Sequence, residues 1–212
     1  LTERLIHDLT EGVDQLPIVQ HALNQVWHAA DNGKEEMDLI HYAMVGGMPV
    51  NELPEEQIDR FKKWFEDLTP EIKACYRNPN LQNVRDTHTN KLWEQAEVYY
   101  ANKTGKYISD EDAKSIIKTA FICLTKIDQG RAVRNRMTLK EIVNLIGRPE
   151  FGTKEVGDVL NIFREPGNTF LRPFILDDAE SQNLNEEDVL DITHESLIRN
   201  WVYLGQWAKE EF

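Results

Sequence analysis

Histidine, glutamate and serine stand together at residues 194–196, a combination that hydrolytic sites use. His194-Glu195 matches the first half of the His-Glu-x-x-His zinc motif, but the second histidine would fall at position 198, which is Ile198. Both histidines are needed, because they bind the metal from one face of a helix. Ser196 lacks the flanking glycines of a nucleophile elbow. We therefore predict no catalytic residue and no metal ligand in this segment.

Two Gly-Lys pairs, Gly33-Lys34 and Gly105-Lys106, look like parts of a phosphate-binding P-loop. A P-loop needs a glycine, four residues and then Gly-Lys-Ser/Thr, so that backbone amides surround the phosphates. Both pairs lack the upstream glycine and the hydroxyl residue. Residues 174–178 (FILDD) imitate a magnesium-binding strand end, but without a P-loop we interpret them as a strand that enters an acidic turn. We expect the isolated chain to bind no cofactor and to be no enzyme by itself.

Three arginines, Arg131, Arg134 and Arg136, form the densest basic segment. Guanidinium groups at such spacing suit a phosphate, a nucleic-acid backbone or an acidic partner. The alternative is a solvated loop whose arginines pair with the surplus acids of this chain. Both interpretations stay open from the sequence alone.

Composition excludes some classes of protein. The chain has 212 residues with 41% hydrophobic residues, and 37 acidic against 24 basic residues give a net charge of -13. Such an acidic chain is a poor ligand for nucleic acid, and no apolar run approaches the length of a membrane-spanning helix. Two cysteines, Cys75 and Cys123, are too few for a disulfide framework or a zinc site and fit a reducing cytoplasm. Because the chain starts at Leu1 without a methionine or a leader, we expect a segment of a longer protein.

Helical periodicity dominates the first half of the chain. A helix is expected over about 15–30, with Asp14 as its N-cap, Pro17 in its first turn and an apolar stripe that is formed by Leu16, Val19, Leu23, Val26, Trp27 and Ala30. Asp31-Asn32-Gly33 should end it, and a shorter helix over 38–45 should stop at Gly46-Gly47. Residues 51–92 look like an inserted helical piece with polar breaks at 78–80 and 86–90, and another helix is expected over 92–103.

The second half has the order of a winged-helix domain. Helices are expected from Ser109 to Ile127, from Thr138 to Gly147 and from Thr153 to Phe163, with an arginine-containing loop after the first. Strands are expected over 170–176 and 189–193, followed by one long final helix. The third helix of this domain carries Lys154 and Arg164 against Glu155 and Asp158, and therefore offers few donors for DNA. We predict a mainly α chain: a helical-bundle lid domain, then a winged-helix domain with a small antiparallel β-hairpin wing.

Three stretches together resemble a family. Residues 15–27 (QLPIVQHALNQVW), 163–171 (FREPGNTFL) and 191–201 (DITHESLIRNW) are similar to successive motifs of the bacterial novel STAND NTPases, signalling ATPases of the NACHT and NB-ARC group. Gly46-Gly47 and residues 128–134 add to the likeness, which covers about 1–50 and 93–212. The family pattern lacks the segment 51–92, and Asn200 replaces a usual histidine or glutamine.

The resemblance implies a domain order and a role. Residues 1–50 and 93–108 would form a helical lid, 51–92 an insertion, and 109–212 the winged-helix domain with its final helix. A nucleotide-binding core would precede the chain and a sensor region, often of WD repeats, would follow it. ATP or ADP with Mg would bind in the parent, ADP would hold the lid closed, and ATP exchange would release it for oligomerisation.

The resemblance also implies two nucleotide contacts. Pro17 would pack near the adenine, and His194 would touch the β-phosphate of ADP. The plainer alternatives are a first-turn proline that starts a helix and a histidine that caps or packs beside one. The competing function for the whole chain is a stand-alone winged-helix protein that binds a partner or DNA.

Overall fold

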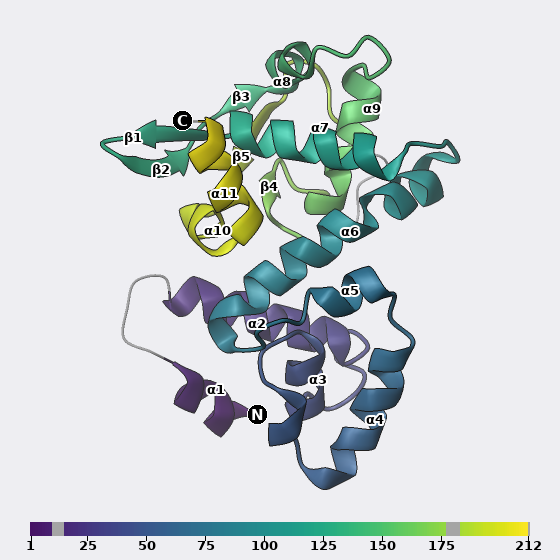
Figure 1. Ribbon diagram of the computed structural model, residues 1–212, viewed down its shortest axis with the longest axis vertical. Coiled ribbons are helices and arrows are strands. Elements are labelled where there is room, and N and C mark those ends of the chain that lie inside the picture. Colours follow the sequence, from purple (N-terminus) through teal and green to yellow (C-terminus); the bar gives the residue numbers. More distant parts are fainter. Residues whose placement is uncertain (10–14, 177–182, 212) are drawn as a thin grey trace. The chain divides into compact units, whose positions relative to one another are not determined.

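The computed structural model describes residues 1–9, 15–176 and 183–211, and its fold is mainly α-helical (Figure 1). The chain divides into two compact units, Leu1–Lys91 and Leu92–Phe212, each with its own hydrophobic core. No helix in the described ranges is long and apolar enough to span a membrane.

The first unit is built from short helices around one core. Its elements are α1 (Thr2–Asp8), α2 (Gln15–Ala29), α3 (Leu39–Met44), α4 (Glu55–Glu66), α5 (Pro70–Ala74) and the first part of α6 (Val84–Thr104), with 3-10 turns at Val50–Glu52 and Leu81–Asn83. The predicted end of α2 is confirmed, because Asp31, Asn32 and Gly33 all have positive φ. The expected N-cap, Asp14, lies outside the described residues.

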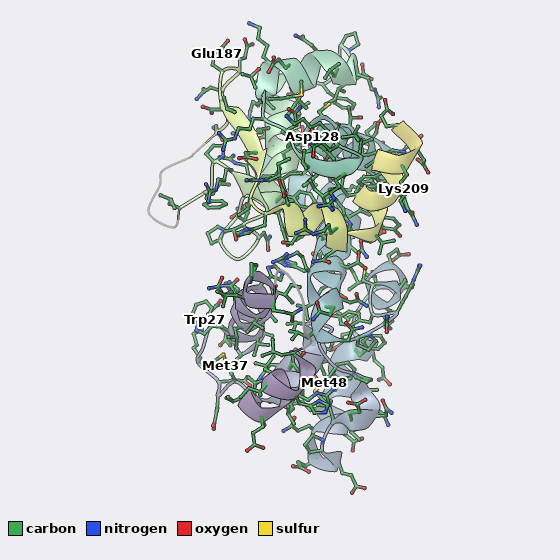
Figure 2. All side chains as sticks on the ribbon, turned by 90° about the vertical axis from the view of Figure 1, so that its left-hand side faces the viewer. Trp27, Met37, Met48, Asp128, Glu187 and Lys209 are labelled. Atoms are coloured by element: carbon green, nitrogen blue, oxygen red, sulfur yellow. The ribbon has the colours of Figure 1, made fainter. Side chains whose placement is uncertain are left out.

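The predicted buried face of α2 is wrong in part. The core of the unit takes Ile18, Ala22 and Val26 from this helix. Leu16 and Trp27, expected on the buried stripe, are 67% and 42% exposed, and Trp27 lies at the surface of the unit (Figure 2). Sequence periodicity identified the helix but could not choose between two apolar faces, because α2 carries both.

Residues 51–91 share the core of residues 1–50. Leu53 and Phe61 pack in the same cluster as Ile40 and Tyr42. The prediction of a polar break at 86–90 is wrong, since α6 runs through these residues without interruption. Some of its polar side chains find partners within the helix, as when Thr89 Oγ1 donates to the carbonyl of Arg85 at 2.9 Å. Polar side chains that are satisfied locally do not terminate a helix.

The second unit contains the three predicted helices and the two predicted later strands in the expected order, together with a short strand, β3, that was not expected. They are α7 (Asp110–Cys123), β3 (Met137–Thr138), α8 (Leu139–Ile146), α9 (Thr153–Leu160), β4 (Leu171–Arg172) and β5 (Val189–Ile192). The three short strands form an antiparallel sheet in the order β3-β5-β4. The capping box of Thr138 and Glu141 opens α8, and Gly147, with φ of 64°, closes it. The last part of α6 joins this core through Tyr100, whereas the resemblance assigned 93–108 to the lid.

The loop expected after α7 is instead a β-hairpin. β1 (Thr125–Asp128) pairs antiparallel with β2 (Arg131–Arg134), and Gln129 and Gly130 at its turn have positive φ. Two central residues with positive φ match the twist of the flanking strands. The strand expected over 170–176 is limited to β4. Residues 177–182 of the acidic segment that follows lie outside the described residues.

The long helix expected at the end of the chain is broken in two. α10 (Glu195–Asn200) and α11 (Val202–Glu211) meet at Trp201, which has an extended backbone. The Trp201 ring is fully buried, with centroid distances of 4.9 Å to Phe121 and 5.9 Å to Phe163. The break coincides with the burial of this large ring in the aromatic core. The apolar spacing of residues 197–208 continues through the break and therefore predicted a single helix.

Candidate functional site

The junction between β5 and α10, residues 191–195, contains His194, the histidine that the sequence singled out. It lies in the second unit, where β5 is the central strand of the three-stranded sheet. The last residue before the histidine, Thr193, is held by the segment before β4: its amide donates to the carbonyl of Phe170 at 2.9 Å, and its hydroxyl donates to the carbonyl of Thr169 at 2.8 Å. Two hydrogen bonds therefore hold the backbone that leads into α10.

His194 occupies the N-cap position of α10. Its backbone is extended, with φ of -138° and ψ of 135°, and its carbonyl accepts a hydrogen bond from the amide of Leu197 at 2.9 Å. The residue is exposed, while Leu197 and Ile198 of the same helix are buried. An exposed imidazole beside the amides of a helix N-terminus has the chemistry to meet an anion.

Two of the three arginines converge on one carboxylate. Asp191, on β5, is only 6% exposed, and its Oδ2 accepts from Arg136 Nε at 3.0 Å and lies 3.5 Å from Arg134 Nη1. The third, Arg131, lies opposite Asp128 in the β1–β2 hairpin; Asp128 is labelled in Figure 2. Pairing with acids of the chain is thus observed for Arg134 and Arg136, and contact of the arginines with phosphate or a partner stays a prediction.

Arg134 also contacts the backbone of the junction. Its Nη1 donates to the carbonyl of Ile192 at 3.1 Å and lies 3.4 Å from the carbonyl of Thr193. The hairpin that carries it is tied to the end of α7, where the amide of Asn135 donates to the carbonyl of Leu124 at 2.8 Å. A guanidinium group can reach a carboxylate and backbone carbonyls together, because its donors form a rigid planar fork.

Pro17 belongs to the first unit and is described there by itself. It lies in the first turn of α2 and is partly buried. Its carbonyl accepts a hydrogen bond at 3.0 Å from Nη2 of Arg85, a buried residue of α6. The proline thus occupies a first-turn position, where its missing N–H leaves no bond unmade, and its carbonyl is held by an arginine that the sequence did not indicate.

The surface of α9 is a poor match for a nucleic-acid recognition helix. Lys154 pairs with Asp158 at 2.7 Å, and Glu155 pairs with Lys106 at 3.3 Å. A cavity of about 490 Å³ is lined by Lys106, Lys154 and a third lysine, Lys103. Lys103 pairs with Glu165 at 2.8 Å. Each ammonium group thus has a carboxylate partner within the unit, which leaves little net positive charge for phosphates.

Glu165 illustrates the electrostatics of this cavity. Burial opposes ionisation, but hydrogen bonds from Lys103 and from the Tyr99 hydroxyl, at 2.7 Å, leave the pKa of Glu165 below its usual value. Burial and the same carboxylate raise the pKa of Tyr99. The group is thus an internally neutralised network with the role of holding α6 against the end of α9.

Asp191 and the pairing of His21 with His88 were missed from the sequence. Asp191 was not singled out, although it stands three residues before His194 in a stretch of apolar residues. His21 and His88 come from α2 and α6, and His21 Nε2 lies 3.2 Å from His88 Nδ1. Their separation of 67 residues left no local signal. Within the described ranges, no three histidine, cysteine or acidic side chains form a group that could hold a metal ion.

Comparisons with known proteins give no further assignment. No protein-family model, curated protein or solved structure matched this chain.

Proposed function

We propose that this chain is the regulatory helical and winged-helix module of a STAND-type ATPase switch. In that role it helps to hold ADP in the closed state and relays the nucleotide state to sensor or effector domains. The observation that carries the proposal is the exposed His194, which lies two residues after the end of β5 and is the N-cap of α10. The 191–201 stretch resembles the family segment whose histidine contacts the β-phosphate of ADP.

The chemistry asked of this chain is binding and not bond cleavage. The imidazole of His194 would donate one hydrogen bond to a phosphate oxygen, and the first amides of α10 would add a favourable field. Pro17 would pack against the adenine with its backbone held by Arg85. The upstream nucleotide-binding core would supply the P-loop and Mg, so the hydrolytic step would take place there.

A two-state switch follows from these contacts. ADP that touches both the core and this module would favour the closed state, because a ligand shifts an equilibrium by its differential affinity for the two states. Exchange for ATP would remove part of that preference and release the module for assembly with other copies.

Replacement of His194 with alanine in the protein that includes the nucleotide-binding core tests the proposal. One hydrogen bond to a charged group contributes about 1.5–3 kcal/mol, so ADP should dissociate roughly ten- to a hundredfold faster. The rate can be measured by stopped-flow displacement of a fluorescent ADP analogue. Equal off-rates for the variant and the wild type would remove the basis for this role of His194.

Two controls separate a nucleotide contact from a folding defect. His7→Ala removes another exposed histidine, on α1, and should leave the ADP off-rate unchanged. His194→Ala in the chain described above should change the free energy of unfolding only modestly, because the side chain is exposed. Unfolding of that chain by His194→Ala would instead assign the histidine a structural role.

A further inference from the structure

The base of the β1–β2 hairpin connects two segments that are distant in sequence. Arg134 is the last residue of β2, and the next residue, Asn135, is fixed to the end of α7 through its amide and its side chain, which donates to the carbonyl of Cys123 at 2.8 Å. The base of the hairpin is therefore held in place before any contact with the β5–α10 junction is counted.

From this base, Arg134 contacts three successive residues of the junction. Its Nη1 lies 3.5 Å from Asp191 Oδ2, 3.1 Å from the carbonyl oxygen of Ile192 and 3.4 Å from that of Thr193. Thr193 is bonded on its other side to the residues before β4, as described above. The residue that precedes His194 is thus held from two directions.

The charge pair strengthens this anchor. The two atoms Arg134 Nε and Asp191 Oδ1 are buried and have no hydrogen-bond partner among the described residues. Asp191 is the buried partner of this pair, whereas the Arg134 side chain is 35% exposed. Loss of Arg134 would leave the buried carboxylate with one donor fewer, which disfavours displacement of Arg134. Arg136 shares the same carboxylate from a side chain that is 71% exposed, and it makes no backbone contact with the junction in the described part of the chain.

We propose that Arg134 is a positioning residue that fixes the backbone before His194 and thereby sets where the imidazole meets the ADP β-phosphate; this rests on the proposed function. Arg134 acts through the carbonyls of Ile192 and Thr193 and does not touch the nucleotide. Arg136 contributes charge to Asp191 but not backbone geometry, which makes it the matched control.

The first test uses hydrogen exchange in the chain described here. Arg134→Gln should accelerate exchange of the Thr193 amide by about tenfold, because one charged donor to the junction is lost. Arg136→Gln should change this rate by less than about twofold, since the Arg136 side chain is 71% exposed and donates only to Asp191 among the junction residues described. Equal effects of the two variants, or none from Arg134→Gln, would overturn the positioning role. If Arg134→Gln does not fold, Arg134→Lys allows the same comparison with the charge retained.

The second test measures ADP release from the protein that includes the nucleotide-binding core. Arg134→Gln should raise the off-rate of the fluorescent ADP analogue by about tenfold in the wild-type background and by less than about twofold in the His194→Ala background. Such non-additivity supports action through His194, whereas additive effects contradict it. If His194→Ala alone has no effect on ADP, the proposed function fails, and the exchange experiment still decides whether Arg134 orders the junction.

Discussion

Lys91 should make the stability of the first unit depend on pH. Its ammonium donates to the Tyr76 hydroxyl at 2.9 Å, and that hydroxyl donates to the carbonyl of Met44 at 2.6 Å. The residue is only partly buried, yet burial around the ammonium lowers the pKa of Lys91 from 10.5 to about 8, against an opposing effect of the nearby Cys75. The folded state therefore disfavours the protonated form.

The size and sign of the effect follow from this shift. A change from 10.5 to about 8 corresponds to roughly 3 kcal/mol of penalty on the charged form. Below pH 8 both the folded and the unfolded states are protonated, so the full penalty applies. Between pH 8 and 10.5 Lys91 is protonated in the unfolded chain but not in the folded one. The free energy of unfolding therefore rises with pH over this range.

Lys91→Met removes the penalty together with the hydrogen bond to Tyr76. Loss of that bond costs about 1 kcal/mol, so the variant should be more stable than the wild type by about 2 kcal/mol at pH 7. Above pH 10.5 only the lost bond counts, and the variant should be less stable by about 1 kcal/mol. The difference between the two proteins should therefore change sign in alkali.

Urea unfolding at pH 7 and pH 10.5 measures this difference. The indole NMR signal of Trp64 reports on the relevant part of the unit, because its ring lies 5.9 Å from that of Tyr76. Lys62→Met, which removes an exposed lysine of α4, is the control and should have the same small effect at both pH values. A Lys91→Met difference that is equal at pH 7 and pH 10.5 would refute the argument from burial.

Two further predictions concern packing and nucleic acid. Gly47→Ala should destabilise the first unit by about 1–3 kcal/mol in thermal or urea unfolding, because a Cβ would lie 1.8 Å from Cε2 of the fully buried Tyr42. Gly205→Ala, in α11, has no neighbour closer than 3.8 Å and should be neutral or slightly stabilising; an equal loss in both variants would contradict the steric explanation. The chain should bind duplex DNA weakly or not at all at physiological salt, since its net charge is -13 and Lys154 is paired with Asp158. Sub-micromolar, salt-sensitive binding by fluorescence anisotropy would instead favour a stand-alone DNA-binding protein.

Local chemistry explains which elements the sequence could determine. Thr138 and Glu141 lie three residues apart and make their capping box without help from the rest of the chain. Gly147 and the Asp31-Asn32-Gly33 segment end their helices with positive φ for the same local reason. The mainly α class and the order of the winged-helix elements follow from such signals in succession.

The remaining features depended on which surfaces meet. The core of the first unit decides that α2 buries the face with Ile18 and exposes Leu16. The core of the second unit, which takes in the Trp201 ring, decides where the last helix breaks. The same is true of the junction before His194: Arg134 and Asp191 are 57 residues apart, and only folding of the hairpin base against β5 brings them together. The sequence could single out His194 as a candidate because its motif is contiguous. The residues that contact the backbone before it come from separate elements, and only tertiary packing selects them.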